Sequence, residues 1–244
     1  MKIVATIEAR MGSSRLPGKV LRTILGKPML ELMIERVKQA RGIDQIVIAT
    51  SRNTRDDPLE ALARRTGVGC YRGSEDDVLD RVLQAAKTYT AEHIVELWGD
   101  TPLIDPQIID KAVRYYLEND FDCVGTCLDR KFPWGMSLLI FPAAILEEVS
   151  KITNDPVDRE NVSNYIYEHP EKYAIGHLPC PAEINRPEIR LTVDELPDFE
   201  LVSKIFENLG NKNQFFTTLD ILKFLDAHPE LKDLNKLVKQ RKAK

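Results

Sequence analysis

The side chains best suited to chemistry gather near the start of the chain, in the stretch EARMGSSRLPGK. Arginine offers two parallel hydrogen bonds to phosphate oxygens, lysine acts as a point charge, and glycine lets backbone amide groups approach a ligand closely. Cations, glycines and hydroxyl groups in one short stretch therefore predict a cradle for a polyanion such as a triphosphate. The residues of this candidate site are Arg10, Gly12, Ser13, Ser14, Arg15, Gly18 and Lys19.

This stretch departs from the ordinary P-loop in two ways. A P-loop has four residues between its first glycine and its Gly-Lys-Ser/Thr end. Here five residues separate Gly12 from Gly18, and Val20 stands where the magnesium-binding hydroxyl group is needed. The alternative is a solvated surface turn, which is the less favoured interpretation because three cations follow directly after a strand-like run.

Two aspartates are candidate metal ligands. Asp100 ends the apolar run HIVELWGD, and Asp194 lies near the end of IRLTVDE. Magnesium usually takes one or two carboxylates together with phosphate oxygens of a substrate, so this pair predicts a Mg²⁺ site. The alternatives are a helix N-cap for Asp100 and a turn aspartate before Pro197 for Asp194.

Two further polar stretches allow two interpretations each. In RGSEDDVLDR, Arg72, Gly73 and Ser74 lie at a predicted strand end, where they could face a nucleobase, while the acidic residues cap the next helix. In DRENVSN, Glu160 and Asn161 lie at a predicted helix start, where they either cap the helix or bind an acceptor.

The elements that position these residues alternate over the first 120 residues. Buried strands are predicted at 2–9, 43–51, 67–74 and 93–100, and helices follow from residue 28 and at 57–67, 75–89 and 105–118. This order predicts a parallel sheet with helices on both faces, whose ligands bind beyond the carboxyl ends of the strands.

The remainder of the chain is less regular. Strands at 122–128 and 136–142 have no helix between them, which predicts an antiparallel part of the sheet. The other expected elements are a helix at 157–170, strands at 172–181 and 188–195, a helix at 197–210, two helices within 217–240, and a solvated basic end at 240–244. Thr217 and Asp220 have the spacing of a capping box.

Composition limits the class of protein. The 244 residues suit one α/β domain, and the net charge of −4 argues against a nucleic-acid-binding protein that relies on positive charge. The cysteines are scattered, and Cys123 and Cys127 are expected to be small buried thiols. Because no apolar run is long enough for a membrane helix, the sequence predicts a cytoplasmic enzyme that does not act in a membrane.

Five motifs in this order resemble the sugar-activating cytidylyltransferases, which include CMP-Kdo and CMP-sialic acid synthetases and the spore-coat polysaccharide F-type proteins. The motifs are IEARMGSSRLPGKVL, RGSEDDVLDR, GDTPLIDP, DRENVSNYIYEHP and LTVDELPDFELV. Together they span nearly the whole chain, and the resemblance is strongest to the spore-coat branch.

The resemblance implies a Rossmann-like, three-layer α/β nucleotidyltransferase fold in a single domain, 1–244, in which about 120–180 form an acceptor and dimerisation region. It implies CTP and Mg²⁺ as ligands and a homodimer. Arg10, Ser13, Arg15 and Lys19 would bind the triphosphate, and the segment from Arg72 would help to read cytosine. Asp100 and Asp194 would hold the metal, and the catalytic residues would be Lys19, Arg15 and Asp100.

The chain departs from the family pattern where the acceptor is expected to bind. Trp98 replaces a smaller polar residue, FPWGMS has Ser137 where an acid is frequent, and DRENVSN has Asn161 where DREHVTP is usual. Trp98, Trp134, Glu160 and Asn161 are therefore the candidate acceptor-binding residues. A sialic-type acid, a Kdo-like acid and a phosphorylated metabolite all remain open as small anionic acceptors.

The implied reaction is transfer of CMP from CTP to a sugar acid or phosphorylated acceptor, with release of pyrophosphate, for surface polysaccharide precursors. Two alternatives are a nucleotide-sugar-dependent glycosyltransferase and a non-catalytic nucleotide-binding relative. The first commonly has Asp-x-Asp at a strand end, whereas this chain has Asp100-Thr101-Pro102. The second would be expected to lose the acidic pair, and both aspartates are present.

Overall fold

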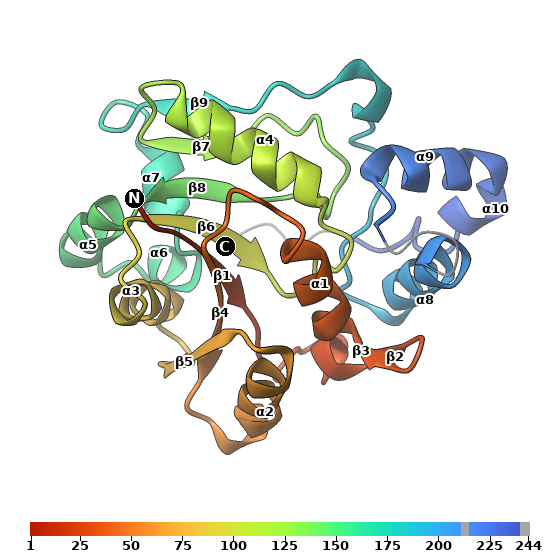
Figure 1. Cartoon of the computed structure of the whole chain (residues 1–244), viewed down its shortest axis with the longest axis horizontal. Coiled ribbons are helices and arrows are strands. Elements are labelled where there is room, and N and C mark those ends of the chain that lie inside the picture. The colour runs from red at the N-terminus through yellow and green to blue at the C-terminus, as the bar shows by residue number, and fades with distance from the viewer. Residues whose placement is uncertain (211–214, 240–244) are drawn as a thin grey trace.

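The computed structural model of the protein describes residues 1–210 and 215–239. Its centre is a seven-stranded sheet in the order β5-β4-β1-β6-β8-β7-β9 (Figure 1), and β2 and β3 form a separate two-stranded ribbon. The strands are β1 (Ile3–Glu8), β2 (Thr23–Ile24), β3 (Lys27–Pro28), β4 (Gln45–Ser51), β5 (Gly69–Gly73), β6 (His93–Trp98), β7 (Cys123–Gly125), β8 (Leu139–Pro142) and β9 (Ile175–His177).

The first half of the sheet is parallel, as the alternating order of elements predicts. β1 lies between β4 and β6, and Ile7 pairs with Ile48 on one side and Leu97 on the other. All three side chains are fully buried, which is why these strands read as continuous apolar runs rather than as alternating ones. At the carboxyl end, Glu8 pairs with Ala49 and Trp98, so the loops after these strands share one edge of the sheet.

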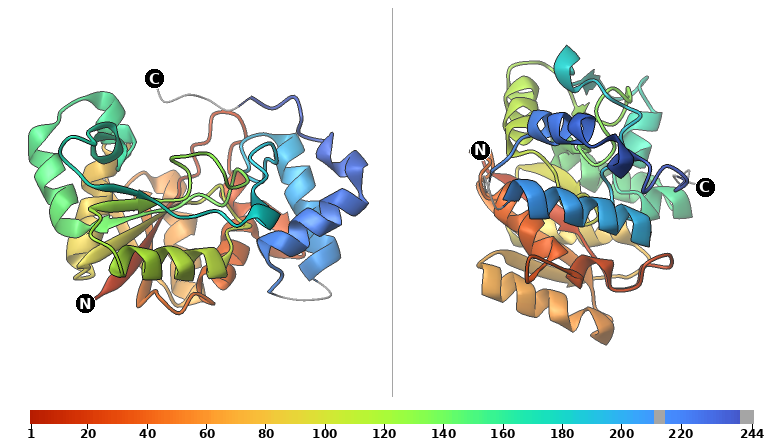
Figure 2. Two further views of the ribbon diagram at one scale, coloured as in Figure 1. Left: turned by 90° about the horizontal axis from the view of Figure 1, so that it is seen from above. Right: turned by 90° about the vertical axis from the view of Figure 1, so that its right-hand side faces the viewer.

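Helices cover both faces of the sheet and complete three layers (Figure 2). The buried core on one face includes side chains of α1, α2, α4, α8 and α9, and the core on the other includes side chains of α3, α5 and α7. The helices are α1 (Met29–Val37), α2 (Asp57–Thr66), α3 (Val78–Thr88), α4 (Pro106–Leu117), α5 (Ala143–Ile152), α6 (Pro156–Glu160), α7 (Asn164–Glu168), α8 (Leu196–Ile205), α9 (Thr218–Ala227) and α10 (Pro229–Lys232), with short helical turns η1 (Lys19–Leu21), η2 (Thr54–Asp56) and η3 (Ala182–Ile184) and a π-helical turn η4 (Phe206–Gly210).

The expected helix ends are confirmed where the sequence shows capping residues. The side chain of Asp105 accepts a hydrogen bond from the amide of Gln107 at the start of α4, and Thr217 and Asp220 form the predicted capping box of α9. α2 ends at Gly67, whose φ of +67° is the left-handed conformation that glycine adopts without strain.

The sheet changes direction at β8, as the helix-free spacing of its two middle strands predicts. β8 runs antiparallel to both β6 and β7, and β7 is parallel to β9. The role of about 120–180 as an acceptor and dimerisation region, and the treatment of 1–244 as one domain, stay predictions.

The prediction of one helix at 157–170 is wrong. α6 ends at Glu160 and α7 starts at Asn164. The chain turns between them because polar side chains take up local bonds: Asn161 donates to the carbonyl of Val157, and Asn164 donates to Asp158. The sequence analysis also omits α5 (Ala143–Ile152), which buries Leu146 and Val149 against the sheet.

The prediction of a strand at 188–195 is also wrong. This segment makes one isolated bridge, in which the backbone of Trp134 bonds Ile189 and Leu191 at 2.9 and 2.7 Å. Farther on, the amide of Val193 donates to the carbonyl of Asp100 at 2.8 Å. The apolar residues that alternate along this segment, Ile189, Leu191 and Val193, are buried. They pack on the core although the segment forms no ladder of backbone hydrogen bonds with a neighbouring strand.

The C-terminal helices α8, α9 and α10 group at one side of the molecule (Figure 1). In the described ranges, no helix has the length and apolar character needed to cross a membrane. The basic end at 240–244, expected to be solvated, lies outside the described residues.

Candidate active site

The loop after β1 is anchored on both neighbouring strands. The amide of Ala9 donates to Ala49 at the end of β4, and the amide of Gly99 donates to the carbonyl of Glu8 from the end of β6. The amide of Met11 donates to the carboxylate of Asp56 at 2.7 Å. These contacts place the loop over the carboxyl edge of the parallel sheet, where the sequence predicts ligand binding.

Within the loop, Gly18 closes the turn that delivers Lys19. Its φ is +68°, which favours glycine, and its amide donates to the carbonyl of Met11 at 3.0 Å. Ser13 stabilises the same turn, because its Oγ accepts a hydrogen bond from the amide of Leu16 at 3.3 Å. Lys19 then starts η1 and points its side chain towards the two predicted acidic residues.

Lys19 joins the acidic pair. Its Nζ lies 3.1 Å from Oδ2 of Asp100 and 3.1 Å from Oδ1 of Asp194, and it donates to the carbonyl of Val193 at 2.7 Å. The two aspartates come from segments on either side of the middle region, yet both face one positive charge. The structure thus brings together the loop and the two acids that the sequence singles out.

Asp194 is surrounded by cations. Nη2 of Arg15 lies 3.0 Å from its Oδ2, and Nη2 of Arg190 lies 2.6 Å from the same oxygen. Burial alone would raise the pKa of Asp194, but Lys19, Arg190 and Arg15 together hold that pKa below its usual value. Asp194 is therefore ionised at neutral pH.

The donor set of this pair fits a magnesium ion. Carboxylate oxygens are hard ligands, and one oxygen from each aspartate already faces a single positive charge. Among the described residues there is no group of three or more histidine, cysteine, aspartate or glutamate side chains that could hold a metal. An ion bound by Asp100 and Asp194 would thus take its other ligands from water and from phosphate oxygens of a substrate.

Arg10 differs from the other cations of the loop. Arg15 and Lys19 are paired with acids, whereas Arg10 makes no hydrogen bond or ion pair within residues 1–210 and 215–239 and is only half-buried. An unneutralised guanidinium beside the loop favours an anionic ligand there.

Gly12 lies against the guanidinium group of Arg55. A Cβ atom at Gly12 would lie 2.6 Å from Nη2 of Arg55. Arg55 in turn pairs with Glu75, and the amide group of Asn53 donates to the same glutamate at 3.2 Å. This contact ties the loop after β1 to η2 and to the RGSEDD segment, and the sequence analysis did not single out Arg55.

Arg72 is held by protein groups rather than left free for a nucleobase. Its guanidinium pairs with Asp57 at 2.7 Å and Glu60 at 3.1 Å, and it donates to the carbonyls of Ser51 and Asn53. Ser74 accepts a hydrogen bond from the amide of Asp77 at 3.0 Å. Arg72, Gly73 and Ser74 lie at the strand end as expected, and their part in nucleotide binding stays a prediction.

The candidate acceptor residues come from three separate segments. Trp98 ends β6 and is half-buried against the core under α3. Trp134 lines a small cavity of about 30 Å³ with Cys127, Arg130 and Ser137, and its backbone bridges to the segment that carries Asp194. Trp134 is thus linked to the acidic pair through the main chain.

Glu160 and Asn161 lie where α6 ends. Glu160 is exposed and ends α6, and Asn161 follows it and donates to the carbonyl of Val157. The prediction that these residues cap a helix start is therefore wrong, because they lie at the end of α6. The neighbouring Arg159 bonds Asp77 through its Nε at 3.0 Å. This contact docks α6 against the start of α3, next to the RGSEDD segment.

Sequence reasoning missed Arg190. It bridges Asp194 and Asp198, and Asp198 accepts hydrogen bonds from the amides of Asp194 and Glu195. An arginine inside a predicted strand gives no sign that it will pair with two aspartates. The spacing of four residues to Asp194 becomes informative only once the segment is known to turn there.

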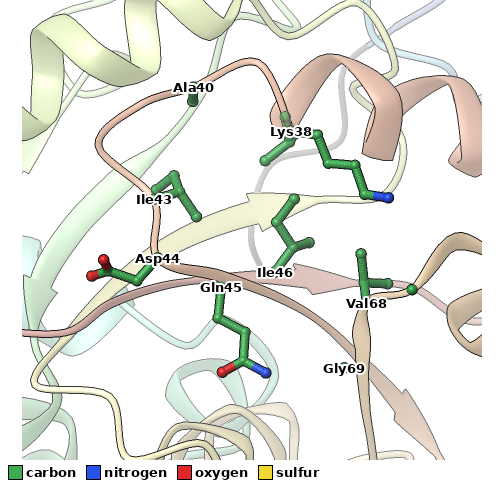
Figure 3. Close-up of a pocket in the computed structure, with 10 residues that line it drawn as sticks. Lys38, Ala40, Ile43, Asp44, Gln45, Ile46, Val68 and Gly69 are labelled. Carbon is green, nitrogen blue, oxygen red and sulfur yellow. The ribbon is translucent and has the colours of Figure 1, made fainter.

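A cavity of about 240 Å³ lies at the opposite end of the strands (Figure 3). It is bordered by the residues after α1 and by the starts of β4 and β5, among them Lys38, Asp44 and Gln45. None of the residues predicted for catalysis lines it, and it lies away from the carboxyl edge that holds the loop after β1.

Comparison with known proteins identifies the family of the chain. Residues 4–221 match the cytidylyltransferase family. The spore coat polysaccharide biosynthesis protein SpsF of Bacillus subtilis is 31% identical over 93% of this chain and 95% of its own length. A 3-deoxy-manno-octulosonate cytidylyltransferase of Geobacter sulfurreducens is 39% identical over 53% of this chain and 51% of its own length.

The fold is also shared with a solved structure. A cytidylyltransferase from Leptospira borgpetersenii superimposes with a TM-score of 0.90 at 32% identity, and the match covers 99% of each chain. The match to the family model spans most of the sequence, and the match to SpsF spans nearly all of it. The protein is an enzyme of the cytidylyltransferase family.

Proposed function

We propose that the enzyme transfers CMP from CTP to a sugar acid or a phosphorylated small molecule and releases pyrophosphate, in the synthesis of a surface polysaccharide precursor. The observation that carries the proposal is the position of Lys19, which bridges Asp100 and Asp194 at the carboxyl edge of the sheet. The name of the SpsF relative supports the polysaccharide pathway, and that of the Geobacter relative supports a sugar acid as acceptor.

The cations of the loop would bind the triphosphate. Among the described residues Arg10 has no hydrogen-bonding or ion-pair partner, so its charge is suited to the phosphates. Arg15 and Lys19 lie against the acidic pair, and they would turn to the phosphate oxygens of bound CTP. Fixed cations aimed at the departing pyrophosphate stabilise the charge that develops on it.

Asp100 and Asp194 would hold Mg²⁺. The bound ion would neutralise phosphate charge and polarise the phosphorus that is attacked. Arg190 and Asp198 act behind this pair, because they fix the backbone and the carboxylate of Asp194.

In the transfer itself, an oxygen of the acceptor forms a bond to the α-phosphorus as the bond to the β-phosphate oxygen breaks. If the acceptor is a phosphate, no proton has to move, and positioning by Arg10, Arg15 and Lys19 is sufficient. A hydroxyl acceptor has to lose its proton, which then requires a base within hydrogen-bonding distance.

The test is release of pyrophosphate from each of the four nucleoside triphosphates with a panel of sugar acids and sugar phosphates, followed by mass spectrometry of the product. We expect release with CTP and a CMP conjugate. Transfer from a CDP- or UDP-sugar, with no pyrophosphate released from CTP, would instead support a glycosyltransferase. Asp100→Asn should abolish turnover with a modest loss of CTP binding, and persisting activity would contradict the role given to Asp100.

The homodimer implied by the resemblance belongs to the same proposal. Light scattering of the purified enzyme should give twice the mass of the 27.8 kDa chain. A mass equal to one chain would remove the dimer from the proposal.

A further inference from the structure

The segment after α10, residues 233–239, docks on the protein through a polar side chain. Asn235 is 5% exposed, whereas its neighbours Leu234 and Leu237 are 38% and 90% exposed. In most docked segments the apolar side chains are the buried ones. The reverse arrangement here indicates that specific hydrogen bonds, rather than apolar burial, hold this segment in place.

A turn presents Asn235 to the rest of the protein. The amide of Val238 donates to the carbonyl of Asn235 at 3.0 Å, so Asn235 is the first residue of the turn, a position that asparagine favours. An asparagine side chain in a turn commonly bonds the backbone two residues on. The side chain of Asn235 instead bonds residues that lie 37 and 45 positions away in the sequence, which the formation of a turn does not require.

Both hydrogen bonds end on the residues that hold Asp194. Nδ2 of Asn235 donates to Oδ1 of Asp198 at 2.8 Å and to the carbonyl of Arg190 at 3.0 Å. Asp198 accepts the backbone amide of Asp194 at 2.9 Å, and the guanidinium of Arg190 lies 2.6 Å from the carboxylate of Asp194. One amide group therefore joins the two ends of the segment 190–198, which has Asp194 at its middle.

The contact is made in a buried environment. Asp198 is 0% exposed, so its carboxylate depends on protein donors for the hydrogen bonds that water would otherwise supply. Loss of the amide group of Asn235 takes one donor from Asp198 and frees the carbonyl of Arg190. A buried carboxylate that loses a donor tends to recover one by moving towards water, and such a movement displaces Asp194.

The same segment reaches the loop after β1. Nη1 of Arg15 donates to the carbonyl of Lys239 at 3.3 Å, while Nη2 of Arg15 lies 3.0 Å from Asp194. In the left view of Figure 2 the chain runs from α10 back towards this loop. Residues 233–239 thus contact Arg15 and Arg190, two of the cations that surround Asp194.

We propose that Asn235 is a positioning residue, which keeps Arg190 and Asp198 in the arrangement that holds the carboxylate of Asp194 in place for the metal. The inference rests on the proposed function, because the metal is assigned to Asp194 there. The residues matched to the family end at 221, so a role for Asn235 does not follow from membership of the family.

The experiment measures how much the metal contributes to nucleotide binding. Calorimetry gives the Kd of the α,β-methylene analogue of CTP with saturating Mg²⁺ and again in a chelator, and the ratio of the two values is the contribution of the metal. Asn235→Ala removes both hydrogen bonds, and Asn235→Ser keeps one donor. The matched control is Asn119→Ala, an exposed asparagine after α4 that donates to the carbonyl of Tyr115 at 2.8 Å.

We expect the ratio to fall about tenfold in Asn235→Ala, the value of one lost hydrogen bond to a charged group, and about threefold in Asn235→Ser. The Kd in the chelator should stay within about twofold of the wild-type value, because the cations of the loop after β1 are unchanged. The kcat of pyrophosphate release should fall in the same order, and the control should match the wild type. Urea unfolding shows that each variant is folded under the assay conditions, and Asn235→Ser provides the comparison if Asn235→Ala does not fold.

A ratio equal to the wild-type ratio in a folded Asn235 variant would overturn the proposal. Equal weakening of binding with Mg²⁺ and in the chelator would also overturn it, because that result indicates a purely structural role. A wild type in which Mg²⁺ adds nothing to binding would remove the metal from Asp194, and the inference with it. Failure of the proposed transfer is a separate result, which the pyrophosphate assay with CTP gives on the wild-type enzyme.

Discussion

The ammonium nitrogen of Lys19 lies 3.1 Å from a carboxylate oxygen of Asp100, although 81 residues separate the two in the sequence. The same nitrogen lies 3.1 Å from a carboxylate oxygen of Asp194, which comes 175 residues after Lys19. The fold therefore assembles the three charges from three distant parts of the chain, and each can be tested separately.

Lys19→Met should lower kcat by about 10²–10³, the usual loss when one preorganised electrostatic contact to a transition state is removed. Methionine keeps the length of the side chain but leaves two carboxylates facing each other. Pyrophosphate release at saturating CTP measures the effect, and Lys111→Met on the exposed face of α4 is the control. A loss in kcat equal to that of the control would contradict the role of Lys19.

Asp194→Asn should destabilise the protein more than Asp100→Asn. The side chain of Asp194 is 12% exposed and contacts Lys19, Arg15 and Arg190. That of Asp100 is 29% exposed, and among the described residues it pairs only with Lys19. Removing the charge of Asp194 leaves Lys19, Arg15 and Arg190 each with one acidic partner instead of two, at a cost of about 2 kcal/mol. Removing the charge of Asp100 costs less than about 1 kcal/mol. Urea unfolding gives both values, and the reverse order would contradict this account.

Removal of divalent cations should abolish pyrophosphate release. We expect a chelator to stop turnover and excess Mg²⁺ to restore it, because the acidic pair by itself provides too few ligands for tight binding. The thermal midpoint should rise more with Mg²⁺ and CTP together than with either alone. Full activity in the chelator would exclude a metal at Asp100 and Asp194.

The stability of the protein should fall as the pH rises from about 4.5 to about 7. Burial raises the pKa of Glu96 from 4.5 to about 7. Over that range the folded chain keeps a proton that the unfolded chain releases, so the free energy of unfolding falls by up to ~1.4 kcal/mol per pH unit and then levels off. Glu96→Gln should remove this part of the slope in urea unfolding. An unchanged slope would show that Glu96 is ionised in the folded state.

Gly135→Ala should damage both stability and activity. Gly135 has a φ of +101°, and a Cβ atom there would lie 2.7 Å from the backbone of Leu191. The clash costs about 2–3 kcal/mol and displaces the segment that carries Asp194. Gly67→Ala is the matched control, because its φ is +67° and its Cβ would meet no atom within 4 Å. Equal losses in the two variants would show that the contact with Leu191 is unimportant.

Local patterns were sufficient for the first half of the fold. Buried strands such as β1 and β4, and capped helices such as α4, carry their signals within a few residues. The errors occur where individual contacts determine the backbone conformation. The hydrogen bond between Asp158 and Asn164 helps to end the helix predicted at 157–170. One backbone bridge to Trp134 replaces the strand predicted at 188–195. These contacts join residues that no periodicity relates.

The site was predictable where charged residues follow the ends of predicted strands. Lys19, Asp100 and Asp194 meet as expected, and the structure adds Arg190 and Arg55, whose partners lie in other segments or in an unexpected turn. The nearness of Glu8 and Glu96 was hidden for another reason. Glu8 and Glu96 alternate with apolar residues like any strand position, and only the register of β1 against β6 shows that they are neighbours.

Because Asp194 belongs to the late segment that packs on Asp100, the order of synthesis matters for this enzyme. A ribosome delivers Lys19 and Asp100 early, but the third charge emerges only after most of the polypeptide has been made. A nascent or truncated chain that stops before this point lacks one member of the acidic pair. If Asp194 has the role proposed for it, such incomplete products do not consume CTP, and the enzyme becomes active only when the polypeptide is nearly finished.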